Sequence, residues 1–99
     1  MASTVALKRI DGSTPCAFDV AVSEGGNTSA HRVTIADDWL ARLGAGRSPE
    51  RVVEAAFRFL LDREAKESIL ARFDVSVIAR YFPEFERTLP RYFRDGSQR

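Results

Sequence analysis

The longest apolar pattern with helical period runs from residue 48 to residue 66. At about 100° per residue its large side chains form an arc of roughly 200°, wider than the apolar stripe of a one-sided surface helix. Ser48 is suited to cap the first turn, and Pro49 lacks the N–H that a first helical residue leaves unpaired. We therefore expect the longest helix at about 49–66, covered on more than one side, with Leu60 at the centre of its buried arc.

Apolar and polar residues alternate in two runs within 16–36, which is typical of half-buried strands. The apolar sets are Phe18, Val20 and Val22 in the first run, and Val33 and Ile35 in the second. A hairpin register that pairs Phe18 with Ile35 places both sets on one face. The same register closes on Gly26-Asn27 as a two-residue type II′ turn, which matches the twist of paired strands. The outward set is then Asp19, Ala21, Ser23, Ala30, Arg32 and Thr34, which is poorly equipped to bind DNA.

Two shorter helices are indicated by caps and breakers. A helix at 39–43 follows two candidate capping aspartates and ends at Gly44. Asp74 is placed to cap a helix over 75–82, and Pro83 ends or kinks it because proline disfavours helical geometry in the preceding residue. The apolar face of that helix comprises Val77, Ile78, Tyr81 and Phe82. Between the long helix and Asp74, the chain either continues helically or begins a short new helix.

The ends of the chain carry weaker patterns. Residues 1–14 leave two alternatives open, a short strand or a loose arm, and the polar residues 94–99 are expected to be frayed. A lone hairpin is marginally stable in water, so its apolar face is expected to lie on the helices. The sequence therefore predicts a single α+β domain over residues 1–99, with an N-terminal antiparallel β-hairpin or three-strand meander packed on three or four helices.

Composition and charge narrow the classes of function. The 99 residues carry 15 basic and 14 acidic side chains, a net charge of +1 at pH 7, and no long segment has a strong excess of either sign. This balance argues against nucleic acid or an anionic membrane as the dominant partner. The chain shows neither the apolar run of a signal peptide nor a stretch of membrane-spanning length. We therefore expect a cytoplasmic protein with no membrane partner.

Two stretches resemble known proteins. Residues 57–86, which contain F-R-F-L-L-D-R-E-A-K and I-A-R-Y-F-P-E-F-E, resemble a group of small uncharacterised bacterial proteins. That resemblance implies a compact bacterial domain and no particular activity. Residues 31–60, with H-R-V-T-I-A-D-D-W-L followed by S-P-E-R-V-V-E-A-A-F-R-F-L, are similar to ribbon-helix-helix DNA-binding domains. This similarity implies a strand, a helix, a turn and a capped helix, and it makes a DNA-binding regulator the alternative function.

Residues that commonly carry chemistry are few. Cys16 is the only cysteine and His31 the only histidine, so no intrachain disulfide can form, and these two alone cannot assemble a zinc site without carboxylates. We interpret His31 as the frayed end of the hairpin's apolar face and Cys16 as a small residue at a strand start. No nucleophile–base pair, paired acid site or phosphate loop stands out, so we expect neither an enzyme nor a bound cofactor or metal.

The C-terminal third concentrates aromatic and arginine side chains. Pro83 and Pro90 interrupt the helices there, so the aromatic rings cannot share one continuous stripe, and at least one is expected to stay partly exposed. Core packing is expected for most of these rings, whereas a protein-binding surface is the functional hypothesis and nucleic-acid stacking a weaker alternative. The candidate surface residues are Phe85, Arg87, Arg91, Tyr92, Phe93 and Arg94. The sequence thus favours a small protein-binding or adaptor module, with a protein partner or a second copy of itself.

Overall fold

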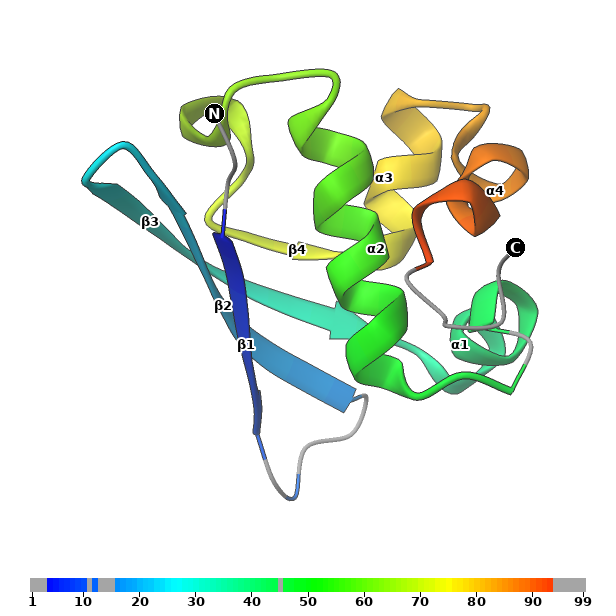
Figure 1. The fold of residues 1–99 in the computed structure, drawn as a ribbon. Coiled ribbons are helices and arrows are strands. Elements are labelled where there is room, and N and C mark those ends of the chain that lie inside the picture. Colours follow the sequence, from blue (N-terminus) through cyan, green and yellow to red (C-terminus); the bar gives the residue numbers. More distant parts are fainter. Residues whose placement is uncertain (1–3, 11, 13–15, 45, 94–99) are drawn as a thin grey trace.

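The computed structural model describes residues 4–10, 12, 16–44 and 46–93. Its helices gather on one face of a 4-stranded sheet (Figure 1). The predicted α+β class is confirmed, since three strands come first in the chain and the helices follow, with one late strand among them. The elements are β1 (Thr4–Ile10), β2 (Cys16–Glu24), β3 (Asn27–Ile35), α1 (Asp37–Gly44), α2 (Pro49–Leu61), η1 (Lys66–Ser68), β4 (Arg72–Asp74), α3 (Val75–Tyr81), α4 (Phe85–Thr88) and η2 (Leu89–Tyr92).

The strands lie in the order β1-β2-β3-β4, with antiparallel pairing of β1 with β2 and of β2 with β3. The three-strand meander is therefore present, and residues 4–10 form a strand rather than a loose arm. β4 lies parallel to β3, where Asp74 pairs with Thr34 although the two residues are 40 positions apart. The sequence pattern did not indicate β4, because 3 residues are too few to show the alternation of a strand.

The turn of the β2–β3 hairpin lies at Gly25-Gly26, so the predicted turn at Gly26-Asn27 is wrong. Both glycines of the actual turn have positive φ, 55° and 88°, which is the backbone of a type I′ turn. Phe18 consequently lies opposite Val33 instead of Ile35. Because side chains alternate along a strand with period two, this two-residue shift leaves the same residues facing the helices. The buried residues of β2 and β3 on that face include Phe18, Val20, Val22, His31, Val33 and Ile35.

α2 begins as predicted and ends earlier. Ser48 caps it, since its hydroxyl accepts a hydrogen bond from the N–H of Arg51 at 3.4 Å. The helix ends at Leu61 and not at residue 66, because the following residues turn back toward the sheet, where η1 and β4 form and Ile69 is buried. The predicted wide apolar arc is confirmed. Its buried residues are Val52, Val53, Ala55, Ala56, Phe57, Phe59 and Leu60.

The C-terminal segment, comprising α3, α4 and η2, completes the core around α2. Asp74 caps α3 as predicted, with its carboxylate accepting from the N–H of Ser76 at 3.0 Å. Phe59 of α2 packs edge-on against three rings of this segment. They are Phe82, Phe85 and Tyr92, with centroids 5.7, 5.1 and 5.8 Å from that of Phe59. Residues 94–99, expected to be frayed, lie outside the described residues.

Candidate functional site

Two aromatic members of the predicted partner surface lie in the core. Phe85 is fully buried, and Phe93 is 8% exposed beneath the guanidinium of Arg47, which lies 4.2 Å from the ring centroid. The other predicted residues are the half-buried Tyr92, the exposed Arg87 and Arg91, and Arg94, which is outside the described residues. Core packing, the expectation for most of these rings, therefore applies to Phe85 and Phe93, and neither ring contributes to a surface.

Tyr92 belongs to a polar network at the C-terminal end of α2. Its hydroxyl donates to Asp62 Oδ2 at 2.6 Å and accepts from Arg63 Nη1 at 3.3 Å. Arg63 also donates to Glu84 Oε2 at 3.2 Å and lies 3.8 Å from the ring centroid of Phe59. The bond to Tyr92 raises the pKa of Arg63, whereas a backbone hydrogen bond and then Arg63 lower the pKa of Glu84. Since these groups engage one another, the network fastens the C-terminal segment to α2.

His31 is a buried residue, 5% exposed, and not a frayed end of the hairpin. A carbonyl oxygen only accepts, so Nδ1–H of His31 donates to the carbonyl of Leu70 at 2.8 Å. With the proton on Nδ1, Nε2 accepts from the hydroxyl of Ser29 at 2.8 Å. The ring also packs on Phe57, with centroids 5.4 Å apart. His31 therefore fastens the segment before β4 to β3. Cys16 lies half-buried at the start of β2, as expected.

An apolar groove of about 290 Å³ lies between the C-terminal end of α2, the segment that leads into β4, and α3. Among the described residues, the exposed large hydrophobic side chains are Leu70 and Tyr81, and both of them line this groove. Leu70 is 49% exposed and Tyr81 is 69% exposed. The remaining apolar lining residues are Leu60, Ile69, Phe73, Val77, Ile78 and Phe82.

Local structure explains the exposure of Tyr81. Val77 and Ile78 precede it by one helical turn on α3 and share its face. The helix ends at Tyr81, two residues before Pro83, so no further turn covers the ring. The sequence placed Tyr81 correctly on the apolar face of this helix. Helical periodicity identifies that face but does not indicate whether another element covers it, and it gave no signal for Leu70.

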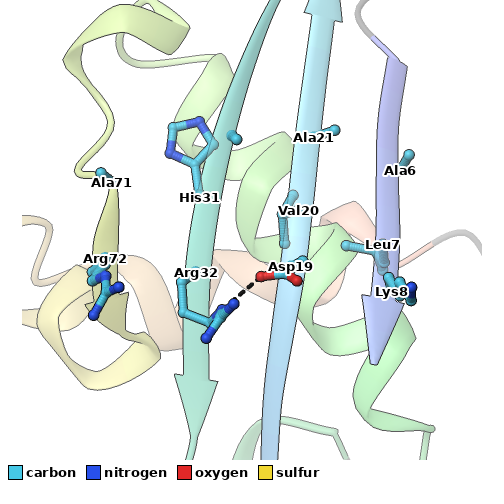
Figure 2. A pocket seen from close by; sticks show the side chains of 11 residues that line it. Ala6, Leu7, Lys8, Asp19, Val20, Ala21, His31, Arg32, Ala71 and Arg72 are labelled. Carbon is cyan, nitrogen blue, oxygen red and sulfur yellow. Dashed lines mark hydrogen bonds and ion pairs between the residues drawn. The ribbon is translucent and has the colours of Figure 1, made fainter. Parts of the chain in front are cut away.

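The face of the sheet away from the helices holds an open hollow of about 490 Å³ (Figure 2). A row of small side chains crosses it, formed by Ala6, Ala21 and Ala30. Beside this row lie Lys8, Asp19, Arg32 and Arg72, one from each strand. Figure 2 shows Arg32 turned toward Asp19, whose Oδ1 accepts from Arg32 Nε at 2.6 Å. The hairpin pattern identified the outward positions of β2 and β3, whereas the cations from β1 and β4 became evident only from the strand pairing.

The chain matches no family model, no curated protein and no solved structure. Within the ranges that the structure describes, no group of three or more His, Cys, Asp or Glu side chains is placed to hold a metal ion. No helix in that part of the chain is both long enough and apolar enough to cross a membrane.

Proposed function

We propose that this chain is a small protein-binding module of a bacterial cytoplasm and that its apolar groove receives a side chain of a partner protein. The observation that carries the proposal is the exposure of Leu70 and Tyr81 beside the groove. Contiguous exposed apolar surface marks interaction sites, because a complex removes it from water. Tyrosine is also among the residues that carry the most binding energy at protein interfaces.

The lining of the groove indicates the chemistry of its occupant. Its volume, about 290 Å³, lies at the lower limit of small-molecule pockets, which span roughly 300–1,000 Å³. Glu64 and Ser68 are its polar lining residues, so few polar groups converge to orient a small molecule. An aliphatic or aromatic anchor from a helix or loop of a partner protein suits this lining better, as in helix-in-groove recognition.

The alternative function, a DNA-binding regulator of the ribbon-helix-helix type, receives less support. In that arrangement the ribbon strand pairs with its copy in a dimer. In this chain β3 is paired with β2 along one edge and with β4 at the other, along the part that carries Arg32 and Thr34. A regulator would therefore have to use another strand or release β4, and the alternative stays a hypothesis.

Affinity capture with a double variant, Leu70→Ser with Tyr81→Ser, tests the proposal. We expect the wild type to recover a defined partner and the double variant to bind that partner about thirtyfold more weakly, since a hot-spot truncation costs about 2 kcal/mol or more. The matched control is Trp39→Ser, which removes a half-buried aromatic side chain that does not line the groove. This control is expected to retain the partner.

Two further measurements make the result decisive. The unfolding midpoint of the double variant is expected to stay close to that of the wild type, because Leu70 and Tyr81 are exposed. Sedimentation of the wild type over a range of concentrations identifies a second copy of the chain as the partner if the mass doubles. Recovery of no partner without self-association, or equal binding by wild type and double variant, would contradict the proposed function.

A further inference from the structure

The open face of the sheet carries a charged row, defined as Lys8, Asp19, Arg32 and Arg72. These residues are successive cross-strand neighbours on β1, β2, β3 and β4, and all of them are exposed. With about 4.8 Å between neighbouring strands, the row is about 14 Å wide. It lies along the hollow that Figure 2 shows, with its side chains available to a molecule placed there.

The charged row has more cations than carboxylates. Asp19 forms an ion pair with Arg32 at 2.6 Å, and within the described residues no carboxylate pairs with Lys8 or Arg72. Arg32 and Arg72 are directly opposite each other on neighbouring strands, an arrangement of like charges that destabilises a sheet. An anion bound in the hollow would reduce this repulsion while occupying the guanidinium N–H groups that Asp19 leaves free.

The next carboxylate along β4, Asp74, bonds to residues outside the charged row. Both oxygens of Asp74 are already engaged, one by the hydroxyl of Thr34 at 2.7 Å and the other by the N–H and hydroxyl of Ser76 at 3.0 and 2.7 Å. Asp74 is thereby directed to the first turn of α3. Asp74 therefore forms no ion pair with the charged row, and the guanidinium of Arg72 stays available to an external ligand.

The rest of the hollow indicates what kind of anion fits. Alanines form the neighbouring row, so an extended chain can approach the sheet closely without a bulky side chain in its way. No phenylalanine, tyrosine or tryptophan lines the hollow, and His31, which does, has both ring nitrogens hydrogen-bonded to Ser29 and Leu70. Single-stranded nucleic acids depend on exposed aromatic side chains for base stacking. A width of about 14 Å matches several residues of an extended peptide at about 3.3 Å per residue.

We propose that the charged row binds an acidic segment of a partner protein, whose carboxylates lie across Lys8, Arg32 and Arg72. Asp19 then competes with the ligand for Arg32 and moderates the affinity. This second surface is independent of the apolar groove. A chain with both surfaces can hold two segments at once, which is the property that defines an adaptor.

Titration of a fluorescein-labelled oligoglutamate peptide, followed by fluorescence anisotropy at low salt, tests this proposal. The double variant Arg32→Ala with Arg72→Ala is expected to bind about twentyfold more weakly, since each exposed charge pair contributes up to about 1 kcal/mol. Asp19→Asn is expected to bind about fivefold more tightly, because it frees Arg32 from its carboxylate. A loss of folding cannot produce that gain.

The matched control is Arg91→Ala, which removes an exposed arginine outside the charged row. It is expected to bind the peptide within about twofold of the wild type. The groove variant Leu70→Ser with Tyr81→Ser is also expected to bind like the wild type, which separates this proposal from the proposed function. Three outcomes would each overturn the proposal that the charged row binds an acidic peptide. They are equal losses in Arg91→Ala and in the double variant, no gain in Asp19→Asn, and tighter binding of duplex DNA than of the peptide.

Discussion

The two faces of the sheet place opposite demands on the same strands. Toward the helices, five residues of β2 and β3 are at most 1% exposed, namely Phe18, Val20, Val22, Val33 and Ile35. The buried polar residue of these two strands is His31, and both its ring nitrogens are hydrogen-bonded. On the other face the strands carry alanines and exposed charges. The covered face therefore holds the fold together, while the open face can carry charge for recognition at little cost in stability.

The largest expected change in the free energy of unfolding is that of Phe18→Ala, and its neighbour Asp19 provides the comparison. Phe18→Ala should destabilise the fold by about 3–5 kcal/mol, because it removes a fully buried ring and leaves a cavity. Asp19→Ala should change the free energy of unfolding by no more than about 0.5 kcal/mol, because its ion pair with Arg32 is exposed. Urea unfolding followed by circular dichroism measures both. Similar costs for the two changes would contradict the distinction between the faces.

The helices that cover the sheet offer a second comparison, between Leu60 and Tyr81. Both line the groove, but Leu60 is 4% exposed and Tyr81 is 69% exposed. Leu60→Ala should cost about 2–5 kcal/mol, as expected for a buried leucine. Tyr81→Ala should cost less than about 1 kcal/mol, because little of its ring is removed from water on folding. The same urea titration measures both costs. A cost below about 1 kcal/mol for Leu60→Ala would show that Leu60 does not lie on the buried face of α2.

His31 links the two faces of the sheet. From the covered face it bonds to the carbonyl of Leu70, and the segment that follows Leu70 places Arg72 on the open face. His31→Leu should cost about 1–3 kcal/mol, since it removes the hydrogen bond from a buried side chain to the carbonyl of Leu70. Amide hydrogen exchange should also accelerate at Arg32, whose N–H donates to the carbonyl of Ala71 at 2.7 Å. If exchange at Arg32 is unchanged while the protein is destabilised, then His31 does not hold this segment in place.

The smallest expected effect concerns Glu84 and pH. Its pKa is lowered in the folded chain, first by a backbone hydrogen bond and then by Arg63. The stabilisation is therefore present above the ordinary value of 4.5 and is lost as the pH falls through the lower folded pKa. Glu84→Gln should melt slightly below the wild type at neutral pH, and the difference should disappear in acid. A difference in melting temperature that is constant with pH would show that the charge contributes nothing.

Much of the covered face could be predicted from the sequence. The alternation around Phe18 and Val33 identified the buried positions even though the turn was wrong, because a two-residue shift preserves the face. Ser48 and Pro49 likewise marked the start of α2. The class of the fold followed from these local patterns.

The sequence could not predict the features that depend on distant pairing. β4 has only 3 residues, and it becomes a strand because β3 offers it an edge. The charged row exists only after β4 has placed Arg72 beside Arg32. The exposure of Tyr81 depends on which elements surround α3, and the predicted surface at Phe85 and Phe93 is core because α2 lies against it. Helical and strand periodicity contain none of this information.

Site-specific photo-crosslinking measures whether a partner protein contacts the groove at Tyr81. A benzophenone amino acid replaces Tyr81 in one variant and Trp39 in the control, and both are irradiated inside the cells that make the protein. We expect one discrete adduct from position 81, weakened by the added change Leu70→Ser, and no such adduct from position 39. The absence of an adduct at position 81, or the same adduct from both positions, would contradict the proposed function.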